Sequence, residues 1–370
     1  MRDIIIFLIK IILRIFWIFP INNSRIFFTS YDGNQFSCNP KYLFYKLNNE
    51  FECVWYLKNQ KIENSIIISK KGFKYYYYIL TSKVLITNVN FSSCIPFRRK
   101  QLLINTWHGG GAYKYAIYNK SSKEICKSYK KFGCFLSSAK IASDLLIRDT
   151  FHFNGKILDS GFPRNDIFFC DKSDEIINKI RKYFKIDSDL FNNSLKVIYA
   201  PTYRDYDETN YSFEKLNFRC LKAALEERFE KKCILFIRTH HYSSLKFDFD
   251  EVYDASTYSD MQELLYGLDI LITDYSSCMW DFSITKKPCF LYVYDYEKYN
   301  NERAFYTNIE DWAFPISFNI DELCRNILEF NQYDYEKKLD VMRKKWGSFE
   351  KGNASDMVYE YIVKEISNGK

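Results

Sequence analysis

The sequence predicts an α/β protein of two domains, each built on a mostly parallel sheet. The chain has 370 residues, enough for two domains of ordinary size, and 47% of them are apolar, enough for two buried cores. Short runs of β-branched and aromatic residues alternate with helical stretches, which is typical of a parallel sheet covered by helices on both faces. A polar, charged stretch over residues 187–194 interrupts this alternation. We therefore expect a first domain over residues 21–188 and a second over residues 189–370, facing each other across a cleft.

The first half contains short apolar runs that predict strands. They cover residues 25–30, 53–57, 66–68, 84–87, 102–105, 135–137 and 156–158. A stretch after a polar loop, residues 39–47, and an aromatic stretch, residues 72–81, predict helices between these strands.

The second half repeats the pattern. Its predicted strands cover residues 197–200, 233–237, 270–272 and 289–292, and its predicted helices cover residues 213–232 and 277–285. A final helix is expected over residues 355–366.

The charge and cysteine content narrow the class of protein. The net charge is +7, from 53 basic and 46 acidic residues, and the excess is dispersed. This suits a protein that meets an anionic membrane surface or a phosphorylated substrate, and no motif for nucleic-acid binding accompanies it, so no nucleic-acid partner is expected.

The 11 cysteines form no C-x-x-C pair, and an odd number of cysteines without a disulfide framework favours a reducing compartment.

The amino terminus is predicted to be a helix that lies in the membrane interface. Residues 4–19 are apolar except for Lys10 and Arg14, and Pro20 ends the run. Sixteen helical residues span about 24 Å, short of the roughly 30 Å hydrocarbon core, and the two cations, four residues apart, share one face. We expect residues 1–20 to attach the protein peripherally to the cytoplasmic face of the cell membrane. The alternatives are a buried first helix, a signal peptide or a true span.

An anion-binding turn is predicted in the second domain. Residues 269–294 read as a strand, a polar turn with two serines, a helix and another strand, which places Asp274, Ser276 and Ser277 at the carboxyl edge of the sheet. Serines that open a helix offer hydroxyl and N–H groups to an anion, and the helix dipole favours negative charge there.

A histidine follows a predicted strand of the first domain. His108 ends the run Thr106-Trp107-His108 and precedes Gly109, Gly110 and Gly111, which allow close approach of the backbone to a ligand. A histidine there is suited to take a proton from a hydroxyl. The alternative is a structural role, as a helix cap or a hydrogen-bonded core histidine.

Three further polar segments follow predicted strands. Arg238, Thr239 and His240 could bind phosphate oxygens and neutralise the charge of a departing phosphate. Thr202 and Arg204 are candidate phosphate contacts, with an exposed turn as the alternative. The turn over residues 161–166 is interpreted as structural. His240 and His241 point oppositely in an extended segment, and no second ligand cluster accompanies them, so no metal site is predicted. No Walker loop and no dinucleotide-binding glycine motif is present.

Eight blocks of the sequence, in order, resemble the CDP-glycerol glycerophosphotransferase family of teichoic-acid synthesis. They are Ser37-Cys38-Asn39-Pro40-Lys41-Tyr42, Thr106-Trp107-His108-Gly109, Gly161-Phe162-Pro163-Arg164-Asn165-Asp166, Tyr199-Ala200-Pro201-Thr202-Tyr203-Arg204-Asp205, Arg238-Thr239-His240, Thr273-Asp274-Tyr275-Ser276-Ser277, Arg303-Ala304-Phe305-Tyr306 and Gly352-Asn353-Ala354-Ser355. The resemblance implies a GT-B architecture of two Rossmann-like domains, with the acceptor on the first and the CDP-linked donor on the second. It also implies attachment to the cytoplasmic face of the membrane.

Two blocks depart from the family pattern. Where the family usually has His-Gly-Thr-Pro-Leu-Lys, this chain has three glycines after His108 and reaches a lysine at Lys114, so the acceptor-side loop of Gly109, Gly110 and Lys114 is differently shaped. Where the family has Arg-Gly-Phe-Tyr, this chain has Ala304 after Arg303.

The expected function is transfer of glycerol phosphate, or a related polyol phosphate, from a CDP-linked donor to a hydroxyl of a lipid-linked or growing cell-surface glycan, with release of CMP. His108 would deprotonate the hydroxyl, Arg238 and His240 would stabilise pyrophosphate charge, and Ser276, Ser277 and Arg303 would hold the donor phosphates. No cofactor or divalent metal is expected. The alternatives are a GT-B glycosyltransferase that uses a nucleotide sugar, and a non-catalytic scaffold of a polysaccharide-assembly complex.

Overall fold

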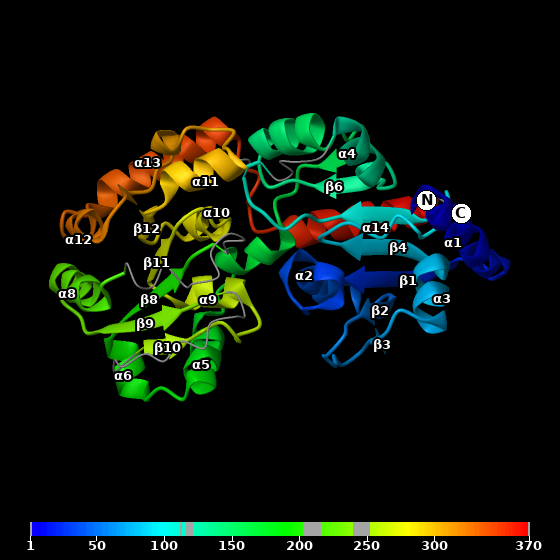
Figure 1. Cartoon of the computed structure of the whole chain (residues 1–370). Helices are drawn as coiled ribbons and strands as arrows, with labels where there is room; N and C mark the ends of the chain where they lie inside the picture. Colours follow the sequence, from blue (N-terminus) through cyan, green and yellow to red (C-terminus); the bar gives the residue numbers. More distant parts are fainter. Residues whose placement is uncertain (1, 112, 116–120, 203–215, 240–251, 369–370) are drawn as a thin grey trace. The chain divides into compact units, whose positions relative to one another are not determined.

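The computed structural model describes residues 2–111, 113–115, 121–202, 216–239 and 252–368 (Figure 1). The chain forms two compact units. Unit 1 comprises Met1–Gly109, Asn119–Phe169 and Ser348–Lys370, and unit 2 comprises Gly110–Tyr118 and Cys170–Gly347. The last residues thus group with the first unit rather than with residues 189–347, because the final helix, α14 (Ala354–Asn368), packs against α2 (Cys38–Leu47).

Unit 1 contains a seven-stranded parallel sheet in the order β3-β2-β1-β4-β5-β6-β7. The strands are β1 (Asn22–Thr29), β2 (Glu52–Tyr56), β3 (Ile66–Ile68), β4 (Ser82–Thr87), β5 (Leu102–Asn105), β6 (Cys134–Leu136) and β7 (Lys156–Leu158). All seven strands predicted for the first half are therefore confirmed. Besides α2, the helices include α3 (Phe73–Thr81), α4 (Ser122–Tyr129), a π-helix (Ala142–Thr150) and a 3₁₀ helix (Pro163–Phe169).

The central strands of this sheet are buried on both faces, which explains their continuous apolar sequences. Phe28 of β1 pairs in register with Trp55 of β2 and Ile86 of β4, and the rings of Phe28 and Trp55 stack at 5.1 Å. Phe44 of α2 and Val358 of α14 pack into the same core.

Unit 2 contains a six-stranded parallel sheet in the order β10-β9-β8-β11-β12-β13. The strands are β8 (Leu195–Ala200), β9 (Cys233–Ile237), β10 (Val252–Asp254), β11 (Ile270–Thr273), β12 (Cys289–Tyr292) and β13 (Ile316–Ser317). The four predicted strands are confirmed. The two strands that the sequence did not predict lie at the sheet edges, and a polar residue interrupts each of them, Asp254 in β10 and Ser317 in β13, so neither forms a recognisable apolar run.

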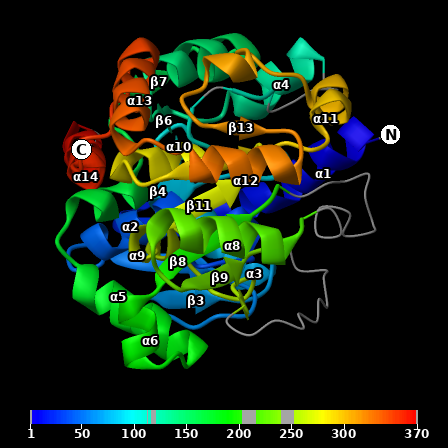
Figure 2. The same ribbon diagram turned by 90° about the vertical axis from the view of Figure 1, so that its left-hand side faces the viewer.

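Helices cover the second sheet. They include α5 (Ser173–Phe184), α6 (Ser188–Asn193), α8 (Phe218–Phe229), α9 (Met261–Gly267), α11 (Tyr296–Arg303), α12 (Ile320–Leu328) and α13 (Gln332–Trp346). Figure 2 shows α8 and α12 lying together over one face. The helix predicted over residues 277–285 is a short α10 (Cys278–Phe282) followed by a 3₁₀ turn (Ser283–Thr285), which ends at left-handed Lys286.

The predicted amino-terminal helix is present but is not continuous. It consists of α1 (Arg2–Leu13) and a 3₁₀ turn, η1 (Arg14–Ile18). Leu13 and Phe16 are buried, and Phe16 packs on Phe73 at 5.1 Å. The opposite side is apolar and exposed; its side chains are Ile4, Ile5, Phe7, Leu8, Ile11, Ile12, Ile15, Trp17 and Ile18. Among the helices of the described ranges, none is long and apolar enough to cross a membrane.

One backbone position carries strain that the sequence explains. Ala304 follows α11 with φ 54° and ψ 160°, a region that glycine adopts readily and residues with a Cβ rarely adopt. The resembling family has glycine here. This strain destabilises the folded state by on the order of 1–3 kcal/mol. A glycine at position 304 would relieve it, and the greater freedom of glycine in the unfolded chain would offset only roughly 0.4–1 kcal/mol of that gain.

We therefore expect Ala304→Gly to stabilise the protein by about 1 kcal/mol, which raises the thermal midpoint of unit 2 by roughly 2–4 °C. Differential scanning calorimetry measures this shift. The matched control is Ala224→Gly inside α8, which should lower the midpoint because glycine is about 1 kcal/mol less favourable than alanine in a helix. A midpoint that falls in both variants would contradict the strain at Ala304.

Candidate functional site

His108 lies in unit 1, in the loop that follows β5, and its ring is held in one tautomer. The Nδ1 atom is 2.8 Å from the carbonyl oxygen of Asn88, in the loop after the neighbouring strand β4. Because a carbonyl oxygen only accepts hydrogen bonds, Nδ1 carries the proton. In the neutral ring Nε2 is then the basic nitrogen. The centroid of the His108 ring lies 4.4 Å from that of the Trp107 ring and 5.7 Å from that of the Tyr31 ring.

The backbone of the His108 loop is held by two buried side chains. Asn39 donates from Nδ2 to the carbonyl oxygens of Thr106 (2.9 Å) and Trp107 (3.2 Å). Arg164 donates from Nη1 to the carbonyl oxygen of His108 (2.7 Å). Trp107 has φ 52°, an uncommon value for a bulky residue, and these hydrogen bonds offset its strain.

Asn39 and Arg164 also contact each other. The backbone N–H of Arg164 donates to Oδ1 of Asn39 at 3.2 Å, and Nη1 lies 3.1 Å from the sulfur of Cys38. Arg164 is 3% exposed. Sequence reasoning interpreted the turn over residues 161–166 as structural and missed that it positions His108. The signal was available, because both residues lie in blocks that carry the family resemblance.

The same turn is connected to the carboxyl-terminal segment of unit 1. Asp166 accepts hydrogen bonds from the N–H groups of Ala354 (2.9 Å) and Ser355 (2.8 Å) at the start of α14. Burial raises the pKa of Asp166, and the hydrogen bonds from Ser355 and Ala354 act in the opposite direction. Glu350 accepts from Asn165 at 2.9 Å. Four of the eight sequence blocks thus meet around the His108 loop.

In unit 2, Asp274 joins the ends of two neighbouring strands. It follows β11 and accepts hydrogen bonds from Thr202, which follows β8: the N–H at 2.8 Å and Oγ1 at 2.6 Å. Asp274 is 1% exposed and also accepts from the N–H of Tyr275. The carboxylate of Asp274 therefore accepts hydrogen bonds from groups of the protein itself, and Asp274 and Thr202 together fix the loops at this edge of the sheet.

Lys114 lies in unit 2 beside this edge. Its Nζ is 3.1 Å from the carbonyl oxygen of Tyr275, immediately before Ser276, and Tyr113 donates to the same oxygen at 2.7 Å. Lys114 also forms a β-bridge with Phe305. The block after the three glycines and the block that begins at Arg303 are therefore neighbours, a pairing that the sequence did not indicate.

Arg303 is placed by its helix. Tyr299 of α11 stacks on Tyr275 at 4.0 Å, and Arg303 follows Tyr299 by four residues, on the same helical face. Lys114 thus contacts the segment that leads to Ser276 and Ser277, and Arg303 lies one helical turn beyond a residue that packs on it.

Gly110 belongs to unit 2 and lies against α10. A Cβ atom on Gly110 would be 3.1 Å from Cβ of Trp280, 3.2 Å from Oδ1 of Asp281 and 3.9 Å from the carbonyl oxygen of Ser277. A glycine at this position therefore permits the close approach of the loop to the helix. Gly109 ends the first segment of unit 1, so the chain passes between the units at residues 109–110.

Ser276 and Ser277 are half-buried at the start of α10. The Ser277 hydroxyl does not cap this helix, which has five residues. The helix dipole is correspondingly small, so an anion here would depend mainly on hydroxyl and N–H groups and on the nearby cations.

Arg238 and Thr239 hold a neighbouring loop. Arg238 donates from Nη1 to the carbonyl oxygens of Ala255 and Tyr258, each at 2.7 Å, and the N–H of Thr239 donates to Ser256 at 3.0 Å. The structure therefore shows Arg238 in a positioning contact. The predicted site residues Arg204 and His240 lie outside the described residues.

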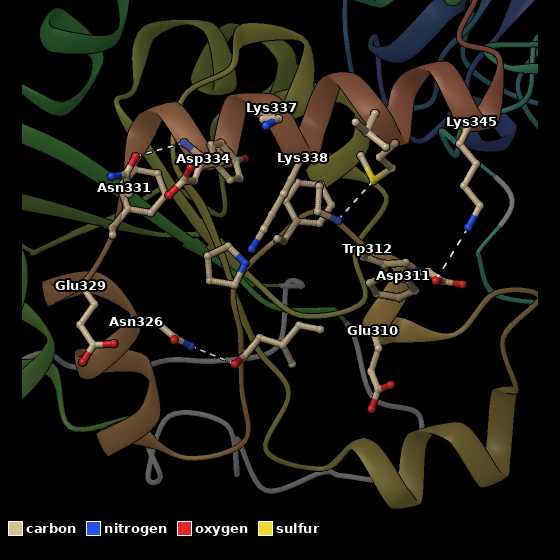
Figure 3. Close-up of a pocket in the computed structure, with 18 residues that line it drawn as sticks. Glu310, Asp311, Trp312, Asn326, Glu329, Asn331, Asp334, Lys337, Lys338 and Lys345 are labelled. Atoms are coloured by element: carbon tan, nitrogen blue, oxygen red, sulfur yellow. Dashed lines mark hydrogen bonds and ion pairs between the residues drawn. The ribbon is translucent and has the colours of Figure 1, made fainter.

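A pocket lies elsewhere in unit 2. It has a volume of about 1000 Å³ and lies between α12, α13 and the segment that leads into β13, with Lys337, Lys338 and Lys345 on α13 (Figure 3). None of the predicted site residues lines it. Within the described ranges, no group of three or more His, Cys, Asp or Glu side chains could hold a metal ion.

Comparison with known proteins identifies the family. Residues 11–364 match the family described as CDP-Glycerol:Poly(glycerophosphate) glycerophosphotransferase. The teichoic acid poly(glycerol phosphate) polymerase of Bacillus spizizenii is 29% identical, with 98% of each chain covered. The teichoic acid glycerol-phosphate transferase of Staphylococcus aureus is 28% identical over 93% of this chain and 94% of that protein. A teichoic acid ribitol-phosphate primase of Bacillus spizizenii is 26% identical over 95% and 93%.

Solved structures show the same fold. The structure of a histidine variant of the wall teichoic acid polymerase TagF has a TM-score of 0.84 at 23% identity and covers 99% of this chain and 96% of that one. A histidine-to-asparagine variant of TagF soaked with CDPG has a TM-score of 0.81 at 23% identity, with 94% and 90% covered. The predicted fold, two Rossmann-like domains of GT-B type, is confirmed. The chain belongs to the CDP-glycerol:poly(glycerophosphate) glycerophosphotransferase family and is a polyol-phosphate transferase that uses a CDP-linked donor.

Proposed function

We propose that this enzyme transfers glycerol phosphate, or a related polyol phosphate, from its CDP-linked donor to a hydroxyl of a lipid-linked or growing cell-surface glycan, with His108 as the general base. The observation that carries the proposal is the hydrogen bond from Nδ1 of His108 to the carbonyl of Asn88, which leaves Nε2 as the basic nitrogen.

The chemistry balances without a covalent intermediate. The acceptor oxygen attacks the phosphorus that bears the polyol, and His108 Nε2 takes the hydroxyl proton. The bond from this phosphorus to the bridging oxygen breaks, and CMP leaves with that oxygen. Catalysis of this kind depends on positioning and on neutralising charge at the phosphates.

The donor phosphates are proposed to bind unit 2 at Ser276 and Ser277. The contact of Lys114 with the carbonyl of Tyr275 supports this proposal, and so does the position of Arg303 one turn beyond Tyr299. Lys114 would then neutralise donor charge rather than contact the acceptor. Asp274, Thr202 and Arg238 would act through the loops that they hold, and the role of His240 stays a prediction.

The alternative donor is a nucleotide sugar. Incubation of the purified enzyme with CDP-glycerol, CDP-ribitol and UDP-sugars distinguishes the two, because only polyol-phosphate transfer releases CMP. Release of UDP with no release of CMP would contradict the proposed reaction.

His108→Ala is expected to lower kcat by roughly 10²–10⁴, because the hydroxyl loses its base. Donor affinity, measured by calorimetry with CDP-glycerol, should stay unchanged. His152→Ala is the matched control, since His152 is an exposed histidine of the same unit, and its turnover should equal that of the native enzyme. Near-normal CMP release by the His108 variant would refute the assignment.

Lys114→Met is expected to weaken CDP-glycerol binding by about ten- to a hundredfold, the effect of one charge-assisted contact to phosphate. Ser276→Ala combined with Ser277→Ala should act in the same direction. Lys231→Met removes an exposed lysine of unit 2 and serves as the charge-matched control. Equal donor affinity in the Lys114 variant and this control would place the donor elsewhere.

We also propose that α1 and η1 hold the enzyme peripherally on the cytoplasmic face of the membrane. The exposed apolar side of this segment supports the proposal, because a helix packed on a soluble protein ordinarily turns such a face inward. Arg14 is exposed near this face, while Lys10 is half-buried, so the cations do not lie equally toward lipid.

Ile12→Glu combined with Ile15→Glu should reduce sedimentation with phospholipid vesicles at least tenfold, since each apolar side chain that enters the membrane contributes about 1.5–3 kcal/mol. Tyr333→Glu, at a residue of unit 2 that is 76% exposed, is the control for added charge. If both proteins sediment with vesicles as the native enzyme does, the amino-terminal segment is not the anchor.

A further inference from the structure

A basic pocket lies at the amino edge of the unit 1 sheet. It has a volume of about 340 Å³, and its lining residues are Ile21, Asn23, Lys83, Arg98, Arg99 and Lys100. These residues precede or begin β1, β4 and β5. His108 and Asn88 follow β5 and β4, at the opposite edge. The four residues of β5 separate the two edges by roughly 13 Å, so this pocket is distinct from the candidate catalytic site.

The pocket is suited to an anion. Four of its six lining residues are cations, and none is a carboxylate. Lys83 is 6% exposed and has no hydrogen bond or ion pair within the described part of the chain. The Nε of Arg98 is buried without a hydrogen-bond partner in the described residues.

The pocket is also joined to the exposed apolar segment. Arg98 donates from Nη2 to the carbonyl oxygens of Phe16 (2.7 Å) and Phe19 (2.8 Å), at the end of η1. Trp17 donates from Nε1 to the carbonyl of Pro96 at 3.0 Å. The loop that supplies three of the four cations is thereby tied to the turn whose Ile15 and Ile18 are 64% and 75% exposed.

We infer that this pocket binds the phosphate of an anionic phospholipid headgroup while the adjoining apolar face enters the membrane. The inference rests on the proposed membrane attachment and names the lipid class that this attachment selects. A phospholipid combines one phosphate with apolar chains, and the structure places a cationic cavity beside an exposed apolar face. Inorganic phosphate would use the cations alone and would leave the apolar face uncovered.

Binding of a headgroup here orients the enzyme. The amino edge of the unit 1 sheet would face the bilayer, and the edge that carries His108 would face away from it. The acceptor hydroxyl would then have to lie beyond the sheet, away from the bilayer. This arrangement favours the hydroxyl at the far end of a lipid-linked glycan as the acceptor, rather than a hydroxyl next to the lipid headgroups.

The test compares vesicles of phosphatidylcholine with vesicles of equimolar phosphatidylcholine and phosphatidylglycerol. The native enzyme should prefer the anionic vesicles. In the double variant Lys83→Gln with Arg99→Gln, the ratio of binding to anionic over neutral vesicles should fall at least tenfold, since each cation near an anionic surface contributes about 1 kcal/mol. The charge-matched control, Lys61→Gln with Lys156→Gln, removes two exposed lysines of unit 1 outside the pocket and should keep most of the preference. Release of CMP with a water-soluble acceptor should be equal in all three proteins.

If the Lys83 variant does not fold, Arg99→Gln with Lys100→Gln changes only exposed side chains and should show the same loss. Variants that bind anionic vesicles as the control does would overturn the inference but not the proposed attachment. Failure of the native enzyme to bind either kind of vesicle would overturn both.

The thermal midpoint measured with and without inorganic phosphate distinguishes a lipid headgroup from a soluble anion as the ligand of the pocket. If phosphate raises the midpoint of the native enzyme but not of the pocket variant, and neither protein prefers anionic vesicles, the pocket is a site for a soluble anion and the lipid assignment is wrong.

Discussion

Parallel strands end at a common edge, and the polar chemistry of both units depends on this constraint. In unit 1 the loops after β4 and β5 lie side by side, so the carbonyl of Asn88 meets the ring of His108 at 2.8 Å. In unit 2 the loops after β8 and β11 do the same, and Thr202 meets Asp274 at 2.6 Å. The amino edge of the unit 1 sheet is subject to the same constraint, which gathers Lys83 and the cations before β5 around one pocket.

Many polar residues of the family blocks hold the backbone rather than face outward. Asn39 and Arg164 bond to carbonyls of residues 106–108, and Arg238 bonds to carbonyls of the loop after β10. Loops that follow strands contain backbone groups with no partner in the sheet, and burial makes an unsatisfied group costly. Side chains with several donors bond to these backbone carbonyls and fix the loop. Loss of such a side chain would therefore move the candidate site residues that the loop carries, although those residues would still be present.

The departures from the family pattern have local explanations. Gly110 lies so close to Trp280 and Asp281 that a side chain there would displace its neighbours. Ala304 keeps a backbone conformation suited to glycine, because its segment pairs with residues 113–115: the N–H of Tyr115 donates to the carbonyl of Ala304 at 3.2 Å, and Lys114 forms a β-bridge with Phe305. The paired backbone therefore maintains the turn at some cost in strain.

The sequence by itself determined the architecture and the main candidates. Continuous apolar runs such as those of β1 and β8 predict buried parallel strands because burial on both faces leaves no polar alternation. His108, Ser276 and Ser277 could be singled out because each follows such a run. The short edge strands β10 and β13 could not be predicted, since pairing with a neighbour rather than local composition creates them.

Only the tertiary structure decided which contacts these candidates make. Three hydrogen bonds illustrate this: His108 with Asn88, Lys114 with Tyr275, and Arg164 with His108. Each of them joins residues more than 15 positions apart in the sequence. The exposure of the apolar side of α1 and η1 was likewise undecided, because an apolar run fits a buried helix and a membrane surface equally well. The packing of the described part of the chain, rather than the local sequence, leaves this side uncovered.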